Sequence, residues 1–263
     1  MRIGLLSPGS LPLPPARCTS VEIYAAHLAR ELSRHHPVTL YARGAKRRVR
    51  VRGDLTTRTW KTRGGTPYVR LVAEDLETNT PSLLQIENRI PFVLPLKKAL
   101  PRVPLVLNLH SNVLIQGLPR KLVDRSLKRV DALVVNSEYL KQFLLSRYPV
   151  LREHQVHVIH PGIDLAHFPS RFSAPGQRLR EKTRARLGVR EEKKVLLYVG
   201  RYIPRKGIGE LLDAFADVHR QHPNTELWIV GGNPSGKGDF HQEMRGKAAG
   251  LPVRFLGFIR QDR

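Results

Sequence analysis

The sequence VLLYVGRYIPRKGIGELL, residues 195–212, carries the clearest structural pattern in the chain. Its apolar run up to Gly200 is typical of a strand in a parallel sheet that is covered on both faces. Arg201 and Lys206 follow in a turn, and a helical pattern begins near Ile208. Loops at the carboxyl ends of parallel strands are where α/β proteins bind ligands. Two cations beside a helix N-terminus therefore predict a phosphate-binding loop, and ordinary surface cations are the simpler alternative.

The same alternation of strands and helices extends along the rest of the chain. Amphipathic segments at 19–35 and 137–148 predict helices, which Thr19 and Ser137 could cap. Strands are predicted at residues 2–6, 37–41, 68–72, 82–87, 104–110, 131–136, 156–160, 195–200, 226–232 and 253–258. This order predicts an α/β fold with doubly wound sheets.

A polar stretch that contains proline and glycine predicts a boundary between two domains. We expect an N-terminal Rossmann-like domain over 1–168, a crossover over 169–193, and a second Rossmann-like domain over 194–263. The second domain has about three strands, which is one half of a six-stranded dinucleotide-binding sheet. Because half a sheet leaves an edge strand and apolar faces uncovered, self-association through this domain is expected.

Composition limits the classes of protein that fit. The 263 residues include 45 Lys and Arg against 22 Asp and Glu, a net charge of +23, and 41% are apolar, which excludes a wholly disordered basic tail. The single cysteine, Cys18, excludes an intrachain disulfide and a multi-cysteine zinc site. No apolar run approaches the ~18 residues of a membrane span, and the amino terminus does not fit a signal peptide. We expect a cytoplasmic protein, with a membrane surface or a spore coat as further candidate locations.

An acid-free basic cluster lies at residues 43–52. Such a cluster suits nucleic acid, an anionic membrane or an anionic substrate, and a solvated face is the simplest interpretation. Only 6% of the residues are aromatic and no base-stacking motif is present, so no specific nucleic-acid partner is expected. Peripheral contact with an anionic surface stays a candidate.

Polar residues follow other predicted strands. His110 ends an apolar strand, so it faces a ligand crevice unless local hydrogen bonds explain its presence. Glu87 and Asn88 give a weaker signal at another strand end. Asp164 is either a catalytic carboxylate or, more simply, the cap of a turn.

The glycine-rich stretch 231–238 matches the start of a nucleotide-binding P-loop. Gly238 replaces the residue that would bind magnesium, and Pro234 lacks an N–H, so a flexible loop is the preferred interpretation. Zinc-hydrolase and serine-hydrolase motifs do not occur.

Several segments together resemble glycosyltransferase family 4, whose members have the two-domain GT-B architecture. The matching segments are LNLHSN (107–112), LVVNSEYLKQFLLSRYP (133–149), VIHPGIDLAHF (158–168), VGRYIPRKGIGELLDAF (199–215) and ELWIVGG (226–232). The region from ENRIPFVLPLKKALP (87–101) to NLHSNV (108–113) is most similar to the spore-coat-associated subgroup.

The resemblance implies that a sugar is transferred, with retention at the anomeric carbon, from a nucleotide-sugar donor to an unidentified saccharide, lipid or protein acceptor. It implies no metal ion and no cofactor, because the nucleotide-sugar is a substrate. By position, Arg201 and Lys206 match the cations that bind the donor diphosphate, and His110 matches a histidine near the transferred sugar. Gly200, Gly231 and Phe255 match the nucleotide-binding region.

Two features depart from the family pattern. Cys18 and Thr19, in ARCTSVEIY (16–24), occupy the place of a Gly–Gly pair that lets the loop approach the donor diphosphate. The E-x7-E motif that grips the donor sugar does not occur before Arg263, so we expect a truncated or frameshifted glycosyltransferase. The alternatives are a non-catalytic nucleotide- or coat-binding protein derived from such an enzyme, and a basic binder of nucleic acid or membrane.

Overall fold

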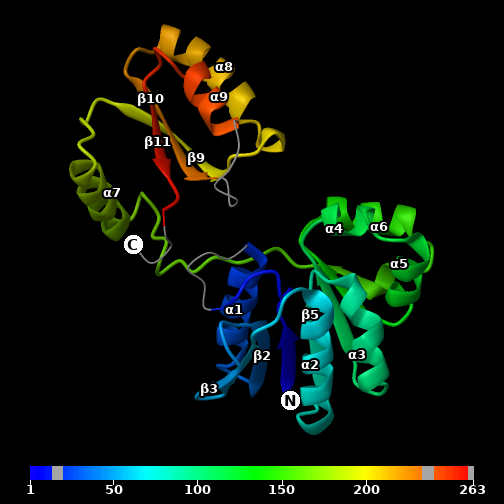
Figure 1. Ribbon diagram of the computed structural model, residues 1–263. Coiled ribbons are helices and arrows are strands. Elements are labelled where there is room, and N and C mark those ends of the chain that lie inside the picture. Colours follow the sequence, from blue (N-terminus) through cyan, green and yellow to red (C-terminus); the bar gives the residue numbers. More distant parts are fainter. Residues whose placement is uncertain (14–19, 233–239, 260–263) are drawn as a thin grey trace. The chain divides into compact units, whose positions relative to one another are not determined.

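The computed structural model describes residues 1–13, 20–232 and 240–259. The chain divides into two compact units, Met1–Gly162 and Ile163–Arg263 (Figure 1). Among the described residues, no helix combines the length and the apolar content that a membrane span requires.

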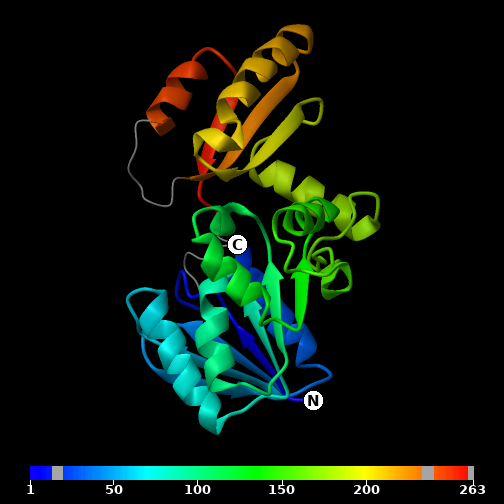
Figure 2. The ribbon, with the colours of Figure 1, turned by 90° about the vertical axis from the view of Figure 1, so that its right-hand side faces the viewer.

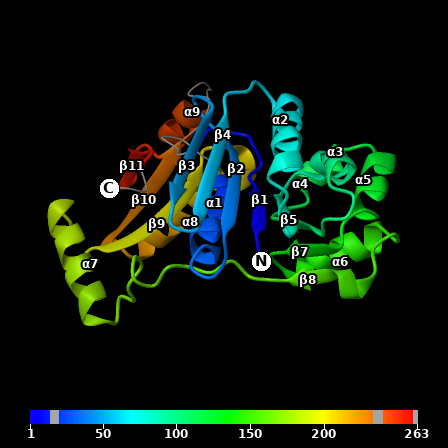
Figure 3. The same cartoon turned by 90° about the horizontal axis from the view of Figure 1, so that it is seen from below.

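The first unit is built on an eight-stranded sheet with the order β3-β4-β2-β1-β5-β6-β7-β8 (Figure 3). All neighbouring strands are parallel except β3 and β4, which are antiparallel. The strands are β1 (Ile3–Leu6), β2 (Val38–Arg43), β3 (Arg48–Arg52), β4 (Leu55–Trp60), β5 (Leu83–Glu87), β6 (Leu105–Leu109), β7 (Ala132–Val135) and β8 (Val156–Val158). The helices are α1 (Ser20–Leu32), α2 (Gly65–Thr78), α3 (Val93–Ala99), α4 (Val113–Gln116), α5 (Arg120–Leu127) and α6 (Glu138–Arg147), with short 3₁₀ turns at Ile90–Phe92 and Glu153–Gln155.

Helices cover both faces of this sheet. Because alternate side chains of a strand face opposite sides, Leu5 of β1 belongs to a buried cluster with Ala25 of α1, whereas Leu6 belongs to one with Val72 of α2 and Leu96 of α3. Figure 2 shows α2 and α3 side by side on their face. The expected doubly wound sheet is confirmed for this unit.

The predicted strand at 68–72 is wrong, because these residues lie in α2. Their β-branched and aromatic side chains favour a strand locally, but Tyr68, Val72 and Leu76 recur at helical spacing and are buried on one face. The sequence reading also missed β3 and β4. β3 is rich in Arg and β4 in Thr, and neither contains the continuous apolar run that predicts a strand.

The predicted start of α6 is confirmed. The Ser137 hydroxyl accepts a hydrogen bond from the backbone N–H of Leu140 at 3.2 Å, and Leu140 and Leu144 are buried. Thr19, the expected cap of α1, lies outside the described residues. Glu22 of α1 is buried, and its carboxylate accepts the backbone N–H groups of Ser10 and Leu11.

The described residues of the second unit form a parallel sheet of three strands, the number predicted, in the order β11-β10-β9. Its elements are α7 (Ala174–Arg186), β9 (Lys194–Arg201), a 3₁₀ turn (Pro204–Lys206), α8 (Ile208–Gln221), β10 (Thr225–Gly232), α9 (Phe240–Lys247) and β11 (Val253–Gly257). Figure 1 shows α7 on one side of the sheet and the α8–α9 pair on the other. On the α7 side, Leu197 and Val199 of β9 are 62% and 70% exposed.

Candidate functional site

Polar side chains gather at the carboxyl edge of the first sheet. They lie near the point where the strand order reverses, with β2 on one side of β1 and β5 on the other. His110 follows β6, and its Nε2 lies 2.8 Å from Oε2 of Glu87 at the end of β5. The His110 backbone N–H donates to Oδ1 of Asn88, and its carbonyl oxygen accepts from Nδ2 of Asn136 after β7. Three neighbouring strands therefore hold one histidine.

The ring of His110 is also held by α1. The Tyr24 ring meets it edge to face, with centroids 4.7 Å apart. Burial, together with the negative charge of Glu87, raises the pKa of the Tyr24 phenol above its ordinary value. The His110 side chain is 14% exposed and Glu87 is fully buried, so the histidine is the member of this pair that solvent or a ligand can reach.

Two arginines tie the loop after β1 to its neighbours. Arg89 donates to the Pro8 carbonyl oxygen and to the Ser10 hydroxyl, and Arg43 donates to the carbonyl oxygens of Gly9, Ser10 and Thr62. The half-buried Arg43 thus has a structural role and does not share the exposed surface of residues 46–52. Cys18 and Thr19, which follow this loop, lie outside the described residues.

Asp164 caps a turn, in line with the simpler of its two interpretations. Its Oδ1 accepts the backbone N–H of Ala166, and its Oδ2 lies 2.9 Å from Nδ1 of His167. These hydrogen bonds, with that of His167 the larger, lower the pKa of the Asp164 carboxyl.

The predicted phosphate loop lies at the carboxyl edge of the second sheet. Arg201 is the last residue of β9, Lys206 ends the 3₁₀ turn, and Gly207, with φ +70°, leads into α8. Both cationic side chains are exposed, and neither forms an ion pair within the described parts of the chain. The loop therefore presents two uncompensated cations beside the N-terminus of a 14-residue helix.

The three predicted nucleotide-binding residues lie close to this loop. Gly200 and Gly231 are register partners in β9 and β10. Phe255 of β11 meets the ring of Tyr202, the residue after Arg201, edge to face at 6.2 Å, and the Arg245 guanidinium lies 5.0 Å from the Phe255 ring centre. The remainder of the glycine-rich stretch, residues 233–239, lies outside the described residues.

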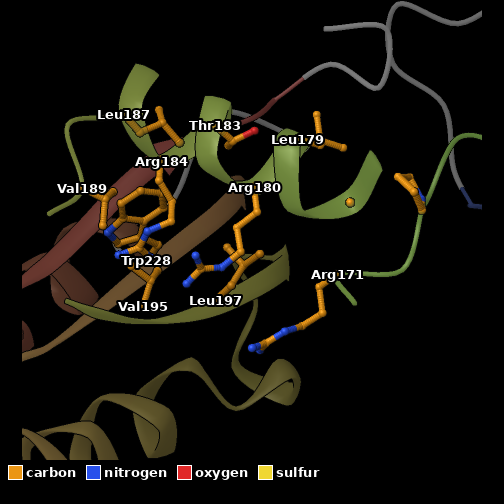
Figure 4. Close-up of a pocket in the computed structure, with 12 residues that line it drawn as sticks. Arg171, Leu179, Arg180, Thr183, Arg184, Leu187, Val189, Val195, Leu197 and Trp228 are labelled. Carbon is orange, nitrogen blue, oxygen red and sulfur yellow. The ribbon is translucent and has the colours of Figure 1, made fainter. Parts of the chain in front are cut away.

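A pocket of about 360 Å³ lies elsewhere in the second unit, between α7 and the sheet (Figure 4). Leu179, Leu197 and Trp228 form its apolar wall, and Arg180 and Arg184 reach over it from α7. None of the predicted site residues lines this pocket. In the described portions of the chain, no group of three or more His, Cys, Asp or Glu side chains is placed to hold a metal ion.

The sequence reading did not assign a role to Asn136 or Tyr24, and it gave Glu87 little weight. Asn136 and Glu87 each stand at the end of a predicted strand, the signal that singled out His110. Tyr24 carries no such signal, since only the packing of α1 brings it to the histidine.

Comparison with known families decides the assignment. The sequence model described as Glycosyltransferase Family 4 matches residues 21–167, more than half of the chain, and that described as Glycosyl transferases group 1 matches residues 180–263. The chain belongs to glycosyltransferase family 4. The first matched region covers most of the first unit and ends at residue 167, just inside the second unit, and the other matched region lies wholly within the second unit.

Relatives support the expected subgroup of this glycosyltransferase. Spore coat protein SA of Bacillus subtilis is 27% identical over 99% of the chain and 70% of the relative's own length. The D-inositol 3-phosphate glycosyltransferase of Corynebacterium kroppenstedtii is 32% identical over 59% of the chain and 37% of its own length. The similarity to the spore-coat-associated subgroup is thereby confirmed.

Solved structures confirm the GT-B fold class. Anabaena HepE in complex with UDP-glucose is 20% identical, with a TM-score of 0.70 over 99% of this chain and 70% of that one. A glycosyltransferase from Rickettsia africae is 18% identical, with a TM-score of 0.72 over 98% of this chain and 68% of that one.

Proposed function

We propose that this glycosyltransferase binds a nucleotide-sugar donor and transfers its sugar, with retention and without a metal ion, to a saccharide, lipid or protein acceptor. The observation that carries the proposal is the pair of exposed cations, Arg201 and Lys206, at the carboxyl end of β9. Negative charge develops on the leaving diphosphate, and fixed cations can stabilise it there. The relative solved with UDP-glucose makes that donor the first to test.

The first unit contributes a different chemistry. The partly exposed imidazole of His110 is suited to a hydrogen bond with a hydroxyl group of the donor sugar, whereas guanidinium and ammonium groups suit phosphate oxygens. We assign the sugar to His110, the diphosphate to Arg201 and Lys206, and the nucleotide to the surroundings of Gly200, Gly231 and Phe255.

Calorimetry with the full chain tests donor binding. UDP-glucose and UDP should bind, and UMP, which lacks the second phosphate, should bind at least about tenfold more weakly because it cannot engage both cations. Binding should be unchanged in EDTA. A folded protein that binds no UDP-, GDP- or ADP-sugar would contradict the proposal.

A second assay separates the enzyme from a non-catalytic binding protein. Release of UDP from UDP-glucose, with water or an added acceptor extract, should be detectable and should fall in His110→Ala. Donor binding with no UDP release under any of these conditions would favour a nucleotide-binding protein that is derived from a glycosyltransferase.

The edge strand β3 favours an anionic lipid surface as an additional partner. All five of its residues are exposed, and none of its arginines forms an ion pair within the described residues. Arg48, Arg50 and Arg52 share one face, with successive side chains ~7 Å apart along the strand. Each basic residue near an anionic bilayer contributes about 1 kcal/mol.

A further inference from the structure

A buried carboxylate lies behind His110. Glu87 has no exposed surface, and the other buried side chains of its strand, Leu84 and Ile86, are apolar and lie on the opposite face. A carboxylate is costly to bury unless hydrogen bonds replace the lost water. Here Oε2 pairs with Nε2 of His110 at 2.8 Å, and Oε1 accepts from Nε2 of Gln85 at 2.6 Å.

The direction of the Glu87–His110 hydrogen bond fixes the tautomer of the histidine. A carboxylate only accepts hydrogen bonds, so Nε2 of His110 must carry the proton. A neutral imidazole protonated at Nε2 has its lone pair on Nδ1. Within the described residues, Nδ1 of His110 has no hydrogen-bond partner.

Other contacts keep the imidazole ring from rotating by half a turn about its bond to Cβ, which would move Nε2 away from Glu87. The Tyr24 ring packs edge to face against it, and hydrogen bonds with the side chains of Asn88 and Asn136 hold the backbone on both sides of the Cα atom. Asn88 itself adopts φ +55°, a left-handed conformation that the surrounding structure must enforce. The histidine is therefore held in one orientation, with one ring nitrogen unused.

We propose that Glu87 is a positioning residue that keeps His110 protonated at Nε2, so that Nδ1 accepts a hydrogen bond from a hydroxyl group of the bound sugar. The inference rests on the proposed function. An acceptor nitrogen pairs with a hydroxyl, which can donate, and not with an ionised phosphate oxygen, which cannot. Glu87 thus makes His110 selective for the sugar part of the donor.

Nitrogen-15 NMR of the imidazole rings tests the tautomer in the full chain without any ligand, and His110→Gln identifies the signals. The neutral wild-type ring should be protonated at Nε2. Glu87→Gln keeps an acceptor oxygen and should keep this tautomer, whereas Glu87→Met should lose it. A wild-type ring protonated at Nδ1, or the wild-type tautomer in a folded Glu87→Met variant, would overturn the inference. If the Glu87→Met variant does not fold, the tautomer measured in the wild type still tests the inference.

Calorimetry with UDP and UDP-glucose tests the consequence. Glu87→Met should leave UDP affinity unchanged and should reduce the additional affinity for UDP-glucose by about 3- to 10-fold, the range of one hydrogen bond. In a His110→Ala background the same substitution should have no further effect, because Glu87 acts through His110. Additive losses, or an equal loss for UDP, would contradict the positioning role. If the wild type binds neither ligand, the proposed function fails and the NMR result still decides the tautomer.

Discussion

A Cβ atom added at Gly231 would lie 1.8 Å from the carbonyl oxygen of Gly200. The two glycines are register partners at the carboxyl ends of β10 and β9, and Gly231 adopts φ +130°, which residues with side chains rarely do. Two backbones therefore meet directly beside Arg201, with no room for a side chain. This close approach sets the position of the loop that carries the candidate phosphate-binding cations.

Gly231→Ala should destabilise the second unit by at least about 2 kcal/mol, because the clash adds to the strain of the positive φ. Gly232→Ala is the matched control, since an added Cβ there meets no atom within 4 Å and should change stability by less than about 1 kcal/mol. Urea unfolding of both variants measures the difference. Equal stabilities would refute the close approach.

Replacing Arg201 or Lys206 by Ala should each weaken UDP binding by roughly 10- to 150-fold, the range of a charge-assisted hydrogen bond. Arg205→Ala removes the same charge from the exposed residue between them and should have a small effect, limited to long-range attraction. Calorimetry at constant salt concentration compares the three variants. A similar loss in all three would mean that net charge, and not a defined site, attracts the nucleotide.

Alkaline pH should destabilise the first unit through Tyr68. Burial raises the pKa of this phenol, whose hydroxyl donates to the Ser7 carbonyl oxygen at 3.4 Å. The unfolded chain ionises Tyr near pH 10 and the folded one does not, so this contribution to stability is present below pH 10 and is lost as the pH rises above it.

Tyr68→Phe should therefore reduce the loss of stability between pH 9 and pH 11 by about 1.4 kcal/mol. Tyr139→Phe, at a residue that is 71% exposed, serves as the control and should follow the wild type. Urea unfolding at both pH values gives the comparison. A Tyr68→Phe variant with the full alkaline loss would show that this phenol does not titrate on unfolding.

Replacing Arg48, Arg50 and Arg52 together by Gln should reduce binding to phosphatidylglycerol vesicles at least about tenfold. The control replaces Arg178, Arg180 and Arg186 of α7, which are also exposed, and should reduce binding much less. Sedimentation with vesicles of phosphatidylglycerol and of phosphatidylcholine measures both. Equal losses in the two variants would assign the attraction to the net charge of +23, not to β3.

Local sequence patterns were sufficient for much of the fold. Apolar runs located β1, β5, β6 and β7, and Ser137 marked the start of α6, because burial and capping depend on residues that are close together in the chain. The same reasoning failed at 68–72, where helical packing against the core outweighed local strand propensity. It also failed at the edge strand β3 and at its neighbour β4, because β3 is exposed and β4 is mostly half-buried, and neither needs a continuous apolar run.

The candidate site, like the fold, was predicted in part by local sequence patterns and in part decided by tertiary packing. The sequence alone singled out Arg201, Lys206 and His110 as candidate ligand-binding residues, since each follows an apolar strand, and carboxyl ends of parallel strands face the ligand side. Only the tertiary structure decided that Glu87 pairs with His110, that Tyr24 packs on its ring, and that Gly231 touches Gly200. Those contacts join residues 23, 86 and 31 positions apart, and strand order and helix packing, not local pattern, bring such residues together.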